Sequence, residues 1–176
     1  VMGDVLYFIA GLWKPWELSA FSINVLELAA ENIGTFTFLA QAVQLGREVT
    51  HSVDFVDNTA AEYSADRGKP AQADMRALVR RRYDALDAAC VYSAVERITS
   101  ADNEWADALS RGADRVADVR RMALAAGLHV VELQPVPEWR DLSGLPGAPP
   151  ADARAVLERQ NQSSASCATT EAMRRK

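Results

Sequence analysis

Residues 49–62, VTHSVDFVDNTAAE, change from the pattern of a strand to the pattern of a helix within a few positions. The β-branched and aromatic residues before Asp57 are typical of a buried strand. Thr59 and Glu62 have the spacing of a capping box, which marks the start of a helix. Asp57 is therefore expected at the carboxyl end of a strand, where open α/β sheets bind ligands. The alternative is that Asp57 or Asn58 only caps the helix.

Strand and helix patterns continue on both sides of this stretch. Apolar runs predict further strands, and apolar periodicity with polar or glycine boundaries predicts helices. The order predicts an α/β fold with a mixed sheet flanked by helices. The further strands are expected at residues 5–13, 91–98 and 128–133, and the helices at residues 24–45, 58–66, 72–89, 103–111 and 113–126.

The length and composition indicate one domain with an appendage. The chain has 176 residues, enough for one core and too few for two full-sized domains. Proline and glycine accumulate after Leu133, so residues 1–133 are expected to be the domain and residues 134–176 a Pro/Gly/Ser-rich linker and largely disordered tail. The domain begins directly with a strand pattern and is expected to be incomplete at its N-terminal side.

Several classes of protein do not fit the sequence. Two cysteines without a CxxC pattern, and only two histidines, indicate neither a disulfide framework nor a zinc site. No apolar run is long enough for a membrane span, and no targeting signal is present. An intracellular location, nucleus or cytoplasm, is therefore expected, with no membrane partner. The net charge of −5 does not suggest a general nucleic-acid binder.

Three acids lie at positions where they could share a ligand. Glu27 is near the start of the long helix, Asp57 is at the expected strand end, and Asp107 is within the helix that follows the next strand. Carboxylates that converge repel one another unless cations lie between them, and Mg²⁺ prefers such oxygen ligands. Glu27 interacting with the helix dipole, and Asp107 pointing to solvent, remain the simpler alternatives.

The motifs INVLELAAE (23–31), VDNTAAE (56–62) and SADNEWADALSRG (100–112) together resemble a known family. They are similar to the ribonuclease H-like domain of retroelement reverse transcriptases, from DIRS-type or related retrotransposons. The order and approximate spacing agree over residues 5–112, and the A-D-x-L-S-R ending is the most specific piece.

The resemblance implies a function and a set of site residues. Glu27, Asp57 and Asp107 would be three of the four family acids that hold Mg²⁺ or Mn²⁺ and cut the RNA strand of an RNA–DNA hybrid. Asn58 and Asn103 would be polar partners at the nucleic acid, and a helix carrying Arg80, Arg81 and Arg82 would hold hybrid phosphates. The expected partners are the hybrid and the polymerase domain of the same polyprotein.

Two features depart from the family pattern. The first family acid and its strand have no counterpart, and Asp4, the nearest candidate, stands too close to Glu27 in sequence. The family histidine before the last acid is replaced by residues 97–100. The chain is therefore expected to be a fragment or a decayed copy. The alternatives are a non-catalytic module that binds nucleic acid or a polymerase domain, and a nucleotide-binding domain of another class, against which no glycine-rich phosphate motif occurs.

Overall fold

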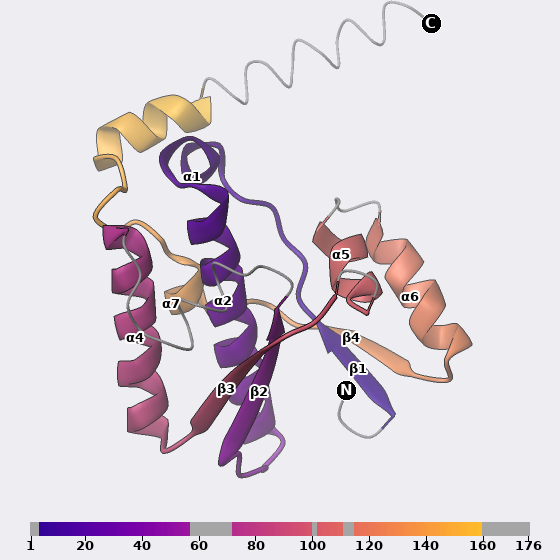
Figure 1. The fold of residues 1–176 in the computed structure, drawn as a ribbon. Helices are drawn as coiled ribbons and strands as arrows, with labels where there is room; N and C mark the ends of the chain where they lie inside the picture. The colour runs from indigo at the N-terminus through magenta and orange to yellow at the C-terminus, as the bar shows by residue number, and fades with distance from the viewer. Residues whose placement is uncertain (1–3, 57–71, 100–101, 111–114, 160–176) are drawn as a thin grey trace, which may run out of the picture.

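The computed structural model describes residues 4–56, 72–99, 102–110 and 115–159 as a mixed α/β fold. Within these residues the strands form two separate parallel pairs, β1 with β4 and β2 with β3, in place of the single mixed sheet that was predicted. In chain order the elements are β1 (Val5–Phe8), α1 (Pro15–Ala20), α2 (Ile23–Gln44), β2 (His51–Val56), α4 (Ala73–Ala89), β3 (Tyr92–Arg97), α5 (Glu104–Ser110), α6 (Val116–Ala125), β4 (His129–Glu132) and α7 (Pro137–Arg140), and residues 151–159 are also helical (Figure 1).

Most predicted helices and strands match the described elements closely, but α1 and α7 were not predicted and β1 is shorter than expected. The long helix predicted at 24–45 is α2, and Gly46 follows it with φ of +66°, the left-handed conformation expected where a glycine ends a helix. The strand predicted at residues 5–13 is paired only over Val5–Phe8, because β4 offers only four partners. The helix predicted at 58–66 lies outside the described residues.

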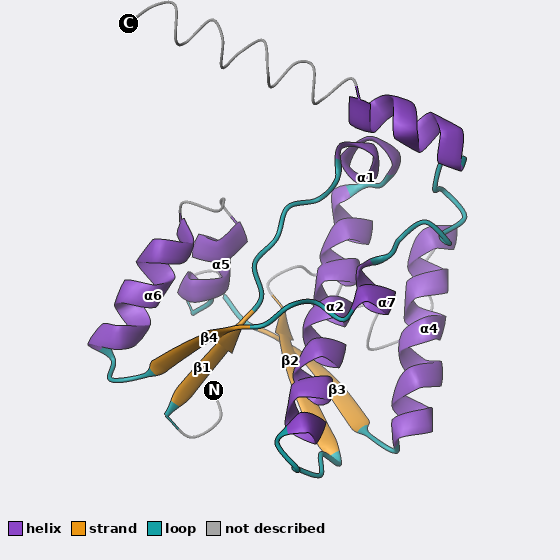
Figure 2. Ribbon diagram, turned by 180° about the vertical axis from the view of Figure 1, so that it is seen from behind, coloured by secondary structure: helices purple, strands orange, loops and turns teal. Residues whose placement is uncertain are grey.

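The helices α2 and α4 cover one face of the β2–β3 pair. The strands lie in front of α2 in Figure 1, and the helices lie in front of the strands in the reverse view of Figure 2. In the parallel register His51 pairs with Tyr92 and Val53 with Ala94, so these residues share the opposite face. On that face Val53, Phe55 and Tyr92 are exposed.

Two connected clusters of apolar side chains form the core around α2. One joins α1, α2 and α4 and includes Leu28 and Leu78, which are fully buried. The other joins α2, α4 and α7 around Phe36 and Trp139, whose rings stack with centroids 3.8 Å apart. A helix that is apolar on several sides needs such cover, which explains the breadth of the apolar stripe on α2. A third cluster, around Leu6 and α6, supports the β1–β4 pair.

Residues 134–159, predicted to be a linker and the start of a tail, contribute to this core. Leu142 is buried against α1, α2 and α4, and Trp139 against Phe36. Arg140 forms two hydrogen bonds to the buried carboxylate of Glu17 on α1, at 2.6 and 2.9 Å. The proline-rich composition therefore marks irregular backbone that is packed on the helices.

Candidate functional site

The three predicted acids are only partly within the described residues. Glu27 lies on α2 and is half-buried. Asp57 and Asn58 lie outside the described residues, and Asp107 lies in α5 with a side chain that is likewise not described. Among the described side chains, no three His, Cys, Asp or Glu are arranged to hold a metal ion. The Mg²⁺ or Mn²⁺ site on Glu27, Asp57 and Asp107 therefore stays a prediction.

The structure instead brings a different set of charged side chains together, between α2, α4 and the β2–β3 pair. Arg82 of α4 is at the centre of this Arg82 cluster, with 1% of its side chain exposed. The Nη1 atom of Arg82 lies 3.1 Å from Asn32 Oδ1, 3.3 Å from Thr35 Oγ1 and 3.3 Å from Glu31 Oε1, all on α2. Its Nη2 atom donates to Asp54 Oδ2 on β2 and, at 2.8 Å, to Ser93 Oγ on β3. Arg82 therefore connects α4 with α2, β2 and β3.

Asp54 is the better satisfied of the two acids in the Arg82 cluster. Besides the Arg82 ion pair, its Oδ2 lies 3.0 Å from Thr35 Oγ1 and 3.4 Å from Ser93 Oγ, both of which can donate a hydroxyl hydrogen. Thr35 Oγ1 also lies 3.0 Å from the carbonyl oxygen of Glu31, so its single hydrogen serves one acceptor at a time.

Glu31 is the less satisfied acid. Its side chain is 6% exposed, and neither carboxylate oxygen accepts a hydrogen bond from the described residues. The 3.3 Å contact with Arg82 is therefore an ion pair without hydrogen-bond alignment. Burial raises the pKa of Glu31 from 4.5 to about 7, an effect that Arg82 opposes and Asp54 reinforces. One buried arginine thus faces two buried acids.

The Arg82 cluster also relates Glu27 to the end of β2. Glu27, Glu31 and Thr35 follow one another at intervals of four along α2, so they form one stripe on the helix. The strand β2 runs antiparallel to α2 (Figure 1), with Asp54 beside Thr35. From Thr35, Glu27 is about 12 Å back along the helix, and from Asp54 the strand end at Val56 is about 7 Å onward. Glu27 therefore lies slightly beyond the carboxyl end of β2.

The predicted nucleic-acid contacts that the structure describes do not form one surface. Arg82 was predicted to contact hybrid phosphates, but its guanidinium is buried and paired with acids and does not face solvent. Arg80 is exposed beside Asp84. Asn103 is half-buried at the start of α5, and α4 and α5 lie on opposite sides of the β2–β3 pair in both views (Figures 1 and 2).

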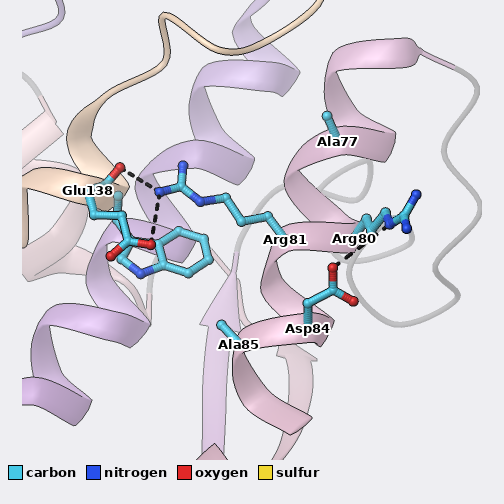
Figure 3. Close-up of a pocket in the computed structure, with 7 residues that line it drawn as sticks. Ala77, Arg80, Arg81, Asp84, Ala85 and Glu138 are labelled. Carbon is cyan, nitrogen blue, oxygen red and sulfur yellow. Dashed lines mark hydrogen bonds and ion pairs between the residues drawn. The ribbon is translucent and has the colours of Figure 1, made fainter. Parts of the chain in front are cut away.

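Arg81 lines a shallow hollow of about 490 Å³ between α4 and α7 (Figure 3). Its guanidinium lies 4.3 Å from the Trp139 ring centre and donates to the carbonyl oxygen of Glu138 at 2.6 Å. The hollow also contains the Arg80–Asp84 pair. The charges of Arg80 and Arg81 are balanced by those of Asp84 and Glu138, which also line the hollow. This surface therefore has no excess positive charge that would attract a phosphate.

No protein-family model, curated protein or solved structure matches this chain. No helix among the described residues is long and apolar enough to cross a bilayer. The functional assignment therefore depends on the chain's own residues and their arrangement.

Arg82 has a signal in the sequence that the motif-based prediction did not use. It continues the spacing of the buried residues Met75, Leu78 and Val79, and so lies on the apolar face of α4. An arginine on the apolar face of a helix indicates a buried partner, because a lone buried charge is very costly. Asp54 has no such signal, because the apolar residues Val53 and Phe55 lie on the other, exposed face of β2.

Proposed function

We propose that this chain is a ribonuclease H-like domain of a retroelement reverse transcriptase, which hydrolyses RNA in RNA–DNA hybrids with a divalent metal. Glu27, Asp57 and Asp107 would be the metal ligands. Carboxylates are the ligand type that Mg²⁺ and Mn²⁺ favour. The bound ions would activate water and stabilise the leaving oxygen. The expected partners are the hybrid and a polymerase domain of the same polyprotein.

One observation carries the proposal. The antiparallel packing of α2 on β2 brings Glu27 next to the carboxyl end of that strand, and Asp57 follows the last residue of the strand directly. The adjacent parallel strand β3 leads into α5, the helix that contains Asp107. The helix α2 and the chain segments that leave β2 and β3 thus direct motifs that are far apart in the sequence toward one end of the β2–β3 pair, although α5 itself packs on α6. This arrangement supports a shared site at that end.

The proposal is tested by cleavage of a labelled RNA–DNA hybrid in the presence of Mg²⁺ or Mn²⁺. Asp57→Asn and Glu27→Gln are expected to reduce cleavage by more than roughly tenfold, since even outer-shell partners of a metal contribute that much. Asp152→Asn, in the exposed part of the helix at residues 151–159, is the matched control and should cleave like the unchanged chain. Cleavage that survives Asp57→Asn would reject the assignment.

A second candidate is a non-catalytic module of the same fold that binds the hybrid or a polymerase domain. Asp4 favours it, because this residue precedes β1, which pairs with β4 and not with β2. Its carboxylate is 77% exposed beside His129. Asp4 thus precedes a strand that is not hydrogen-bonded to β2, which favours a domain without the first family acid. Hybrid binding without metal-dependent cleavage would support this candidate. Absence of both would reject the first candidate and would restrict the second to binding of a polymerase domain.

A further inference from the structure

We propose that Arg82 is a positioning residue that fixes how α2 lies along β2, and thereby sets the place of Glu27 relative to the carboxyl end of that strand. This inference rests on the proposed function for its catalytic part. Its structural part concerns only described residues, and the two parts are tested separately.

The contacts of Arg82 are of the kind that defines a register. Apolar side chains such as Leu and Ala can exchange partners if a helix slides by one turn, because their contacts have little direction. The guanidinium donates to fixed oxygens on α2, β2 and β3, with Asn32 at 3.1 Å and Ser93 at 2.8 Å. A planar fork with five N–H groups satisfies such a set in one arrangement only.

Stability alone does not explain this arrangement. Replacing a buried ion pair by apolar residues of similar size is often neutral or stabilising. Here a second acid, Glu31, is buried beside the same cation and accepts no hydrogen bond from the described residues. An apolar residue at position 31 would avoid the cost of burying this carboxylate. Specifying a register is the best-attested role of buried polar groups that cost stability, and it is the role inferred for the Arg82 cluster.

The register matters at the position of Glu27. A slip of α2 by one turn along β2 would displace Glu27 by about 5.4 Å. Misplacement of a reacting group by about 1 Å can already reduce a rate by roughly a hundredfold. Glu27 is two turns from Thr35, the residue of α2 beside Asp54, so the Arg82 cluster controls the helix close to the proposed ligand.

The test compares Arg82→Lys, Thr35→Val and the matched control Arg121→Lys in the full chain. Lysine retains the charge but cannot donate to all three elements. Valine keeps the shape of Thr35 and removes its hydroxyl contact with Asp54, so it serves if Arg82→Lys does not fold. Arg121 is exposed on α6 and pairs with Asp118, three residues earlier on the same helix.

The first measurement is amide hydrogen exchange, which does not depend on activity. If Arg82 fixes the register, exchange should become faster in β2 and in the middle of α2, but not in α6. Unchanged exchange in β2 and α2 in both Arg82→Lys and Thr35→Val would overturn the proposal. This result stands whether or not the chain cleaves RNA, so it separates failure of the inference from failure of the proposed function.

The second measurement is hybrid cleavage per folded molecule over a range of Mg²⁺ concentrations. Arg82→Lys is expected to reduce kcat by roughly tenfold to a hundredfold, with a higher Mg²⁺ concentration for half-maximal rate and an unchanged KM for the hybrid. A purely structural role would leave kcat of the folded fraction unchanged, and that outcome would overturn the positioning role.

Discussion

At the scale of single residues, Glu31 determines how the fold responds to pH. Its carboxyl group is buried beside Asp54, and Arg82 compensates only part of the cost of its charge. The pKa of Glu31 is raised from 4.5 to about 7. Between these values the folded chain holds a proton that the unfolded chain releases. The contribution of Glu31 to the free energy of unfolding therefore falls as the pH rises.

We expect urea unfolding to show this loss between about pH 4.5 and 7. Since one pKa unit corresponds to about 1.4 kcal/mol, the contribution of Glu31 is on the order of 3 kcal/mol. It is fully present below pH 4.5 and absent above pH 7. Glu31→Gln should remove this pH-dependent part, whereas Glu48→Gln, at an exposed position, should not. Identical pH profiles for Glu31→Gln and the unchanged chain would contradict the prediction.

The burial of individual charges was not predicted from the sequence. Arg82 was assigned, together with Arg80 and Arg81, to an arginine group opposite the apolar face of its helix. Consecutive residues are 100° apart on a helix, however, so Arg80, Arg81 and Arg82 point in different directions. Arg82 therefore lies inside while Arg80 lies in solvent. The burial of an individual charge depends on packing partners that are distant in sequence, and no local pattern specifies them.

At the scale of elements, the periodic segments were predicted well and the irregular ones were not. The helices α2 and α4 and the strands β2 and β3 match the predicted ranges within about two residues, because their apolar periods are long and have clear boundaries. The short helices α1 and α7 were missed, since six and four residues are too few to show a helical period. The place of α7 is fixed instead by Trp139, which packs on Phe36 of α2.

Trp139→Ala is expected to destabilise the protein by about 3–5 kcal/mol, the usual cost of deleting a large buried aromatic side chain. The ring is 6% exposed and stacks on Phe36, so its loss leaves a cavity between α2, α4 and α7. Urea unfolding followed by circular dichroism measures the change. Tyr92→Ala, at an aromatic ring that is 67% exposed, is the control and should cost much less. Equal losses would show that α7 is not part of the core.

At the scale of the whole molecule, the boundary predicted after Leu133 does not separate a domain from a tail. Arg140 and Leu142 complete the surroundings of α1. Composition indicated the boundary because proline and glycine disfavour regular structure. Irregular backbone can nevertheless bury side chains, and composition does not show whether it does.

A chain of residues 1–133 is therefore expected to lose cooperative unfolding, whereas a chain of residues 1–159 should retain it. The shorter chain lacks Trp139, Arg140 and Leu142, and each large buried side chain contributes several kcal/mol to a total that is typically about 5–15 kcal/mol. Heat unfolding by calorimetry distinguishes the two. A sharp transition in the shorter chain would show that the first 133 residues fold independently.

The ion pair between Glu17 and Arg140 joins residues that are 123 positions apart. During translation α1 leaves the ribosome long before its arginine partner is made. At about 5–20 residues per second, this delay is roughly 6 to 25 s. Until then, docking of α1 would bury the Glu17 carboxylate without its cation, which is costly. The fold should therefore close late in synthesis, and pulse-labelled hydrogen exchange on stalled nascent chains should find α1 unprotected until residue 140 has emerged.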